Sequence, residues 1–185
     1  LPGARPMSRL IPLLSCLPIG ASLCAQPDTL FVPSGDTTYA FPLVHGPILN
    51  AEAFVRTSHY AFDTTRVATT LSYRRGKPSG LYRAYYPDGR PLIFAVYGWG
   101  SLHGDWTEYD EQGRVSLKGQ YRMGVREGTW AFRAQGIVGE YKNGVPHGKW
   151  RYYEDGRLAH VEKWHKGKLL QGSTYRFLGI KTPIR

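Results

Sequence analysis

Cysteine is almost absent from this sequence, since Cys16 and Cys24 are the only two and both lie near its beginning. A scaffold held together by disulfides is therefore excluded. Beyond residue 25 no hydrophobic run is long enough for a membrane-spanning helix. Beyond residue 70 there is also no long stretch free of glycine and proline. A long α-helical protein is excluded for that reason.

Glycine and aromatic residues are abundant instead. The 185 residues include 22 Gly, 13 Tyr, 5 Trp and 13 Pro, without low complexity. Hydrophobic residues make up 42% and charged residues 21%, which excludes both a disordered tail and a membrane bundle. This composition favours many short strands joined by tight turns, so we expect an all-β fold of about one domain.

The first 25 residues have the layout of a secretory signal peptide. Arg9 provides a basic start, an uncharged apolar run follows, and the small residue Ala25 precedes Gln26. Two prolines interrupt the run and make it short for a spanning helix. We therefore predict a signal peptide over 1–25, with translation starting at Met7. The protein is then exported to the periplasm, the outer surface or the medium. A lipid anchor on Cys16 or Cys24 is the alternative.

Cleavage after Ala25 would leave a mature chain without cysteine. That chain carries 22 basic and 14 acidic residues, a net charge of +8. Thiol chemistry and cysteine-ligated metals would then be excluded, and no transmembrane helix is expected in the mature chain.

A repeat fills the C-terminal two-thirds of the sequence. Each copy has an aromatic residue, a glycine three later, a second glycine four beyond, and an aromatic two beyond that. The copies are Tyr73-Gly76-Gly80-Tyr82, Tyr97-Gly100-Gly104-Trp106, Tyr121-Gly124-Gly128-Trp130 and Tyr141-Gly144-Gly148-Trp150, with a frayed fifth at Trp164-Gly167-Gly172. We place the repeats at 71–172, as about four and a half copies.

The spacing predicts one β-hairpin per copy. A glycine-rich loop separates the two aromatics, so Tyr141 and Trp150 are expected to lie opposite or nearly opposite each other. Glycine supplies the positive φ angles that tight turns need. The predicted turn glycines are Gly76, Gly80, Gly100, Gly104, Gly124, Gly128, Gly144 and Gly148. We therefore expect an elongated antiparallel meander of stacked β-hairpin repeats.

Side chains that alternate along each strand give this sheet an aromatic face and a polar, mostly basic face. Tyr141, Trp150 and Tyr152 share the first, whereas Glu140 and Lys149 lie on the second. The aromatic face is either the core of the fold or a groove for an extended peptide or glycan. Its candidate ligand-binding residues are Tyr97, Trp106, Tyr121, Trp130, Tyr141 and Trp150.

The run from Gly139 to Gly156, GEYKNGVPHGKWRYYEDG, resembles the MORN repeat. It is most similar to a bacterial variant with Trp after the second glycine, whose members are often catalogued as antitoxin components of toxin–antitoxin systems. The resemblance covers about residues 71–172 and departs from the pattern at Tyr82, which replaces Trp. It implies an elongated, twisted sheet of β-hairpins used for protein or membrane contact rather than catalysis. It implies no particular partner.

The remaining segments differ from the repeats. Residues 26–70 hold two basic and four acidic residues and read as further strands. We expect this N-terminal β segment to cap the first hairpin and to cover part of the aromatic face. Residues 173–185 form a C-terminal tail.

Catalytic and metal-binding patterns are missing. His103 and His147 occupy the same slot two repeats apart, which is too far for one metal ion. The acid pairs Asp110-Glu111 and Glu154-Asp155 recur at equivalent turns, which indicates turn formation. Glu162 and His160 share a face, but two ligands do not make a metal site. We predict no enzyme activity, no metal and no cofactor.

Residues 71–172 carry 17 basic and 10 acidic residues in scattered order, which does not indicate a nucleic-acid partner. We expect the partner to be another protein or an anionic envelope surface. The function predicted is an exported, non-catalytic MORN-type binding or scaffolding module at the cell envelope. An antitoxin-like neutralising protein and an envelope hydrolase with an unrecognised site are the alternatives.

Overall fold

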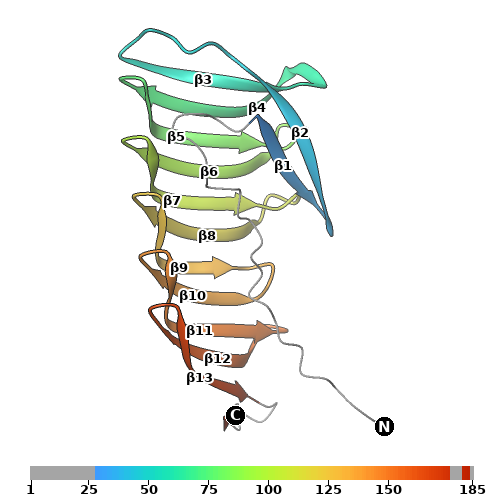
Figure 1. Cartoon of the computed structure of the whole chain (residues 1–185). Helices are drawn as coiled ribbons and strands as arrows, with labels where there is room; N and C mark the ends of the chain where they lie inside the picture. Colours follow the sequence, from blue (N-terminus) through green and yellow to red (C-terminus); the bar gives the residue numbers. More distant parts are fainter. Residues whose placement is uncertain (1–27, 176–180, 184–185) are drawn as a thin grey trace.

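The part of the chain that the structure describes forms a single antiparallel sheet. The computed structural model describes residues 28–175 and 181–183. These hold fourteen strands, and each strand pairs with its neighbours in chain order, as Figure 1 shows. The strands are β1 Thr29–Ser34, β2 Thr37–His45, β3 Ala53–Tyr60, β4 Asp63–Arg74, β5 Lys77–Tyr85, β6 Pro91–Gly98, β7 Ser101–Tyr109, β8 Val115–Arg122, β9 Val125–Phe132, β10 Ile137–Lys142, β11 Val145–Glu154, β12 Arg157–His165, β13 Lys168–Tyr175 and β14 Lys181–Pro183. The predicted all-β meander of stacked hairpins is confirmed.

Two-residue turns connect the strands within each repeat. Asn143 and Gly144, between β10 and β11, have φ angles of 52° and 79°. Positive φ at both positions is the geometry of a type I′ turn, whose twist matches that of the flanking strands. The first glycine of each full copy occupies the second position of such a turn, as predicted.

The second glycines lie inside strands, so the prediction that they belong to the turns is wrong. Gly80 lies in β5, Gly104 in β7, Gly128 in β9 and Gly148 in β11. Each has positive φ, and each lies next to a bulge in the second strand of its repeat.

The bulge between β10 and β11 shows the pattern. Val138 and Glu140 are two residues apart on β10, whereas their partners Arg151 and His147 are four apart on β11. The two-residue turn pairs Tyr141 with Pro146, so Tyr141 does not lie opposite Trp150. The two aromatic rings still meet, with centroids 5.2 Å apart, because the two extra residues in β11 bring Trp150 back toward the β10 residues next to Tyr141.

Buried and exposed side chains alternate along the strands, so the two faces of the sheet differ as the sequence predicts. Tyr141 and Trp150 are buried, whereas Glu140, Lys142 and Lys149 are exposed. The buried residues form one core cluster that runs along the aromatic face from the N-terminal strands to Trp150. A single sheet can bury this much apolar area only by packing rings on one face.

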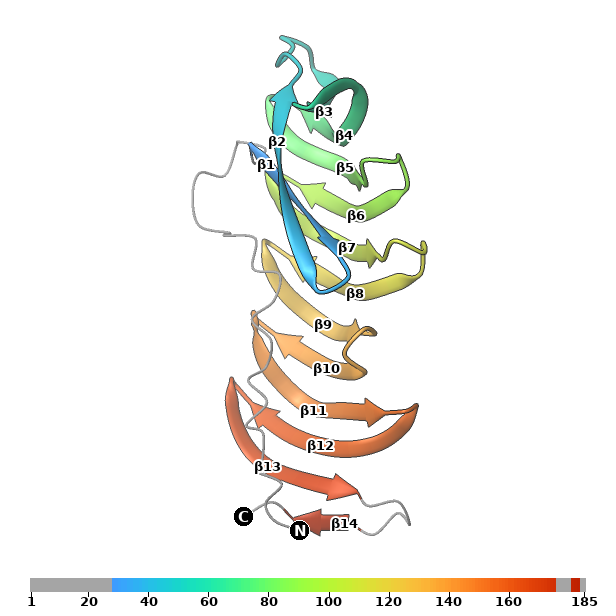
Figure 2. The same cartoon turned by 90° about the vertical axis from the view of Figure 1, so that its right-hand side faces the viewer.

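The N-terminal hairpin contributes to the same core. Strands β1 and β2 run obliquely to the others (Figures 1 and 2), and β2 pairs with β3 over only Leu43 to His45. Leu30 and Val32 of β1 are buried in the cluster. Part of the aromatic face is therefore covered, as expected for residues 26–70.

The predicted segment boundaries fall within strands. β4 continues across residue 70, and β13 continues across residue 172. The predicted signal peptide over 1–25 lies outside the described residues.

Candidate functional site

The six aromatic residues predicted to bind a ligand lie in or against the core. Trp130 is 0% exposed and Trp150 is 1% exposed, and Trp106, Tyr121 and Tyr141 are also buried. The sixth residue, Tyr97, is half-buried and packs against the core with its ring 6.2 Å from that of Tyr82. These rings are therefore not open to a ligand in this structure.

Edge-to-face contacts join five of these six rings, from Trp106 to Trp150, into a continuous row. Centroid distances are 5.5 Å from Trp106 to Tyr121, 5.1 Å from Tyr121 to Trp130, and 6.0 Å from Trp130 to Tyr141. Such pairs add roughly 0.5–1.5 kcal/mol each beyond the area they bury. These ring contacts therefore form the part of the core that connects one repeat to the next.

Arg126 lies on the aromatic face, where no charge was predicted. Its guanidinium carbon is 4.5 Å from the centroid of Trp130 and 5.3 Å from that of Tyr141. Its Nη1 donates a hydrogen bond of 3.1 Å to the Tyr141 hydroxyl. Cation–π attraction and this bond compensate for the water that the guanidinium loses. Arg126 and Trp130 are an even number of residues apart in β9, so the alternation of side chains along the strand could have placed Arg126 on the aromatic face.

Glu108 is the second unexpected charge on this face. Its Oε1 accepts a hydrogen bond of 2.9 Å from Trp106 Nε1. Burial raises the pKa of the Glu108 carboxyl, although the bond from Trp106 and the Arg126 charge act in the opposite direction. The folded protein therefore favours the protonated acid more than the unfolded chain does.

Replacing Glu108 with glutamine should make stability less dependent on pH. A raised folded pKa gives stability that is present below the unfolded pKa, about 4.3, and is lost as pH rises through the folded value. Glu108→Gln is therefore expected to be more stable than the wild type at pH 7, with the difference vanishing below about pH 4. Urea unfolding at both pH values measures this. Glu140→Gln, at an exposed carboxylate on the polar face, is the control. An equal gain in stability at pH 7 in both variants would mean that burial of Glu108 is not the cause.

Near the C-terminal end of the same face, Glu162 gathers three polar partners. Its Oε2 accepts hydrogen bonds from the Tyr152 hydroxyl at 2.7 Å and from Trp164 Nε1 at 2.9 Å. His160 Nε2 lies 3.2 Å from its Oε1. Burial and the Glu162 carboxylate raise the pKa of Tyr152. These contacts fix the position of the Glu162 carboxylate within the fold.

Nothing in the described ranges forms a metal centre, because no group of three or more His, Cys, Asp or Glu side chains there could hold an ion. His103 Nδ1 lies 3.4 Å from the backbone nitrogen of Met123, and the His147 ring packs 5.2 Å from that of His165. The predicted turn positions of the acid pairs are confirmed at both, since Asp155 has a φ of 50° in the turn before Gly156. Asp110 accepts backbone hydrogen bonds from Gln112 and Arg114 within its own turn.

The two-residue turns that close the repeats form the most distinctive exposed surface, which we call the turn edge. It consists of Arg75–Gly76, Trp99–Gly100, Met123–Gly124, Asn143–Gly144 and Lys166–Gly167. Successive turns are tied together, since Gly100 N donates to Pro78 O at 2.9 Å and Gly124 N donates to Leu102 O at 2.8 Å. Gly144 and Gly167 repeat this bond. The edge is therefore a regular row rather than a set of independent loops.

Trp99 and Met123 are out of place at the tips of this row. Trp99 is 87% exposed and Met123 is 76% exposed, and they occupy adjacent turns. Their φ angles are 49° and 50°, in the left-handed region that costs a residue other than glycine roughly 1–2 kcal/mol. Asn, which tolerates this conformation, fills the same position at residue 143. The exposed Val125 and Val145 extend the apolar surface. Large apolar side chains are unfavourable at such exposed positions, and the left-handed backbone is unfavourable for both residue types.

Basic side chains flank the apolar tips. The turn edge and the residues next to it include Arg74, Arg75, Lys77, Arg122, Lys142, Lys166 and Lys168. Arg75 pairs with Glu52 at 3.5 Å, while Glu127 Oε2 accepts a bond from Asn143 N. The edge thus combines basic side chains with exposed apolar side chains.

Within the part of the chain that the structure covers, no helix is both long and apolar enough to cross a membrane. Comparisons of this chain with protein-family models and with the curated proteins find no match.

Proposed function

We propose that this protein is an exported, non-catalytic binding module that docks a partner protein at the cell envelope through its turn edge. The observation that carries the proposal is the pair Trp99 and Met123, which are exposed at 87% and 76% on adjacent turns. Export rests on the apolar N-terminal run of the sequence.

The exposed apolar side chains at these two positions support a binding role, whereas the positive φ is shared by Arg75 and Lys166 in other turns of the row. Positions that break a local rule at a cost in stability tend to be functional. Trp also ranks among the residues that contribute most to binding when an interface buries them. A Trp and a Met that pack against little in the free protein gain contact area only when a partner covers them.

The aromatic face offers little that could support catalysis. The aromatic row is occupied by core packing, and the carboxylates Glu108 and Glu162 are held by hydrogen bonds within the fold. The turn edge, in contrast, presents side chains that point away from the core on a row fixed by backbone hydrogen bonds. A rigid row of this kind lowers the entropy cost of binding.

Substitution by asparagine separates binding from stability. Because Asn tolerates positive φ, Trp99→Asn and Met123→Asn should leave the protein as stable as the wild type or more so. If the two residues are binding hot spots, the double variant should bind its partner at least roughly 30-fold more weakly. Asp155→Asn is the matched control, because Asp155 has a φ of 50° in the two-residue turn between β11 and β12, outside the turn edge, and this variant should bind as the wild type does.

The experiment starts from the full chain, expressed from Met7 in a Gram-negative host and recovered from the envelope fraction. Proteins cross-linked to the wild type are identified, and the dissociation constant of each purified candidate is measured with all variants. Equal affinity of the wild type and the double variant would overturn the docking role of the turn edge. An uncleaved cytosolic product would favour the antitoxin-like alternative.

A further inference from the structure

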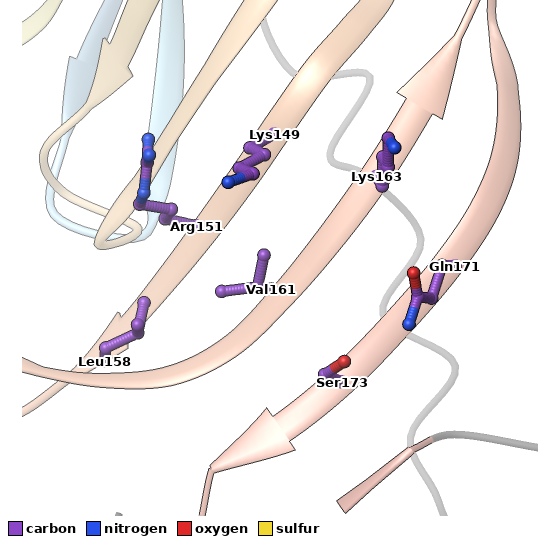
Figure 3. Close-up of a pocket in the computed structure, with 7 residues that line it drawn as sticks. All are labelled: Lys149, Arg151, Leu158, Val161, Lys163, Gln171 and Ser173. Carbon is purple, nitrogen blue, oxygen red and sulfur yellow. The ribbon is translucent and has the colours of Figure 1, made fainter. Parts of the chain in front are cut away.

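A shallow hollow lies on the polar face of strands β11 to β13, as Figure 3 shows. Its volume is about 230 Å³. It is lined by Lys149, Arg151, Leu158, Val161, Lys163, Gln171 and Ser173. The polar side chains come from three neighbouring strands, β11, β12 and β13, so the sheet itself holds them in place.

The charges around the hollow all have one sign. Lys149, Arg151 and Lys163 provide three cations, and no carboxylate lines the hollow. Lys149 and Lys163 are direct cross-strand partners. Like charges directly opposite each other destabilise a sheet. In the described part of the chain none of these three cations has an acidic partner within ion-pair distance, so the repulsion is not compensated.

Elsewhere the same face mixes its charges with neutral and acidic groups. Lys118 on β8 pairs with Thr107 on one side and Ala131 on the other. Asp105 accepts a hydrogen bond of 3.0 Å from Gln120 on the neighbouring strand. The uncompensated cluster is therefore a local feature of β11 to β13 and not a general property of the polar face.

The donors around the hollow match a tetrahedral oxyanion. Two ammonium groups and a guanidinium can neutralise a doubly charged group, while the Gln171 amide and the Ser173 hydroxyl offer further donors. A phosphate group presents several acceptor oxygens to such a set, whereas a carboxylate presents two. Val161 and Leu158 add apolar surface for the carbon skeleton that bears the phosphate.

We propose that this hollow binds the phosphate group of a phosphorylated ligand. The site is separate from the turn edge, and its test does not depend on the partner proposed above. Bound phosphate would relieve the repulsion between Lys149 and Lys163, so binding and stabilisation of the fold are coupled.

Inorganic pyrophosphate is the probe. It should raise the melting temperature of the full chain in a saturable way, and the effect should fall as salt increases. Lys149→Gln/Lys163→Gln should melt higher than the wild type without pyrophosphate, because the repulsion is gone, and should bind the probe at least roughly tenfold more weakly. Lys118→Gln is the control on the same face and should bind as the wild type does.

Two further arms identify the source of the phosphate. Vesicles of phosphatidylcholine with phosphatidic acid are sedimented with the wild type, with and without pyrophosphate. Co-sedimentation that pyrophosphate abolishes assigns the site to lipid headgroups. Pyrophosphate binding without co-sedimentation assigns it to soluble or polymeric phosphates. A melting temperature that pyrophosphate leaves unchanged, or that it raises equally in the double variant, would overturn the proposal.

Discussion

Replacing Trp130 with alanine is expected to lower the free energy of unfolding by about 3–5 kcal/mol. The side chain is 0% exposed, and its ring meets Tyr121 at 5.1 Å and Tyr141 at 6.0 Å. Its Nε1 also donates a hydrogen bond of 3.2 Å to the carbonyl oxygen of Gln120. The variant loses the transfer free energy of a large ring and gains a cavity between two repeats.

The loss should extend beyond one repeat. In stacked repeats, stability is a sum of intrinsic terms and contacts between nearest neighbours. Trp130 lies in β9 and contacts rings of β8 and β10, so its removal weakens the contacts of one hairpin with the next. We therefore expect the C-terminal strands to unfold separately, which a broader urea transition would show.

Urea unfolding, followed by circular dichroism, measures the effect. Trp99→Ala is the matched control, because it removes the same side chain from an 87% exposed position and should change stability by less than about 0.5 kcal/mol or increase it. Unchanged stability of Trp130→Ala would mean that the aromatic row is not the core. The alternative of a peptide or glycan groove would then regain support.

The repeat and its faces could be predicted because their signals are periodic. Aromatic and glycine residues recur at fixed spacing, and the alternation of Tyr141, Trp150 and Tyr152 with charged residues reappears as alternating burial. Turn glycines such as Gly144 were also predictable, since Asn-Gly is a strong type I′ signal. These features depend on local chemistry that sequence alone contains.

The bulge could not be predicted, because it depends on packing between strands. A glycine at Gly148 is equally suited to a long loop and to a bulge, so spacing alone placed Tyr141 opposite Trp150. Likewise, Arg126 and Glu108 appear as ordinary charges in the sequence. Their role on the aromatic face follows from rings contributed by neighbouring strands.

Gly139 and Gly119 show most clearly what the bulge does. Each glycine lies under the indole ring of the following strand, Trp150 or Trp130. A Cβ at Gly139 would overlap the ring carbons Cδ2 and Cε2 of Trp150. The extra residues in β11 bring the indole back over the glycine, and Trp150 Nε1 then donates to Glu140 O at 3.2 Å. Glycine is therefore required at residue 139 because the Trp150 indole packs directly on it, and not because the chain turns there.

Gly139→Ala is accordingly expected to cost about 1–3 kcal/mol or more by overpacking. The backbone of Gly139 is not in the left-handed region, so the cost is steric and should depend on Trp150. A double-mutant cycle in urea tests this dependence. In a Trp150→Ala background the same change should become neutral or stabilising, since alanine is favoured over glycine in a strand by roughly 0.5–1 kcal/mol. Gly113→Ala is the control, because its Cβ meets open space and its cost should come from a φ of 75° in both backgrounds. If the cost of Gly139→Ala stayed the same without the indole, the ring would not be what requires glycine there.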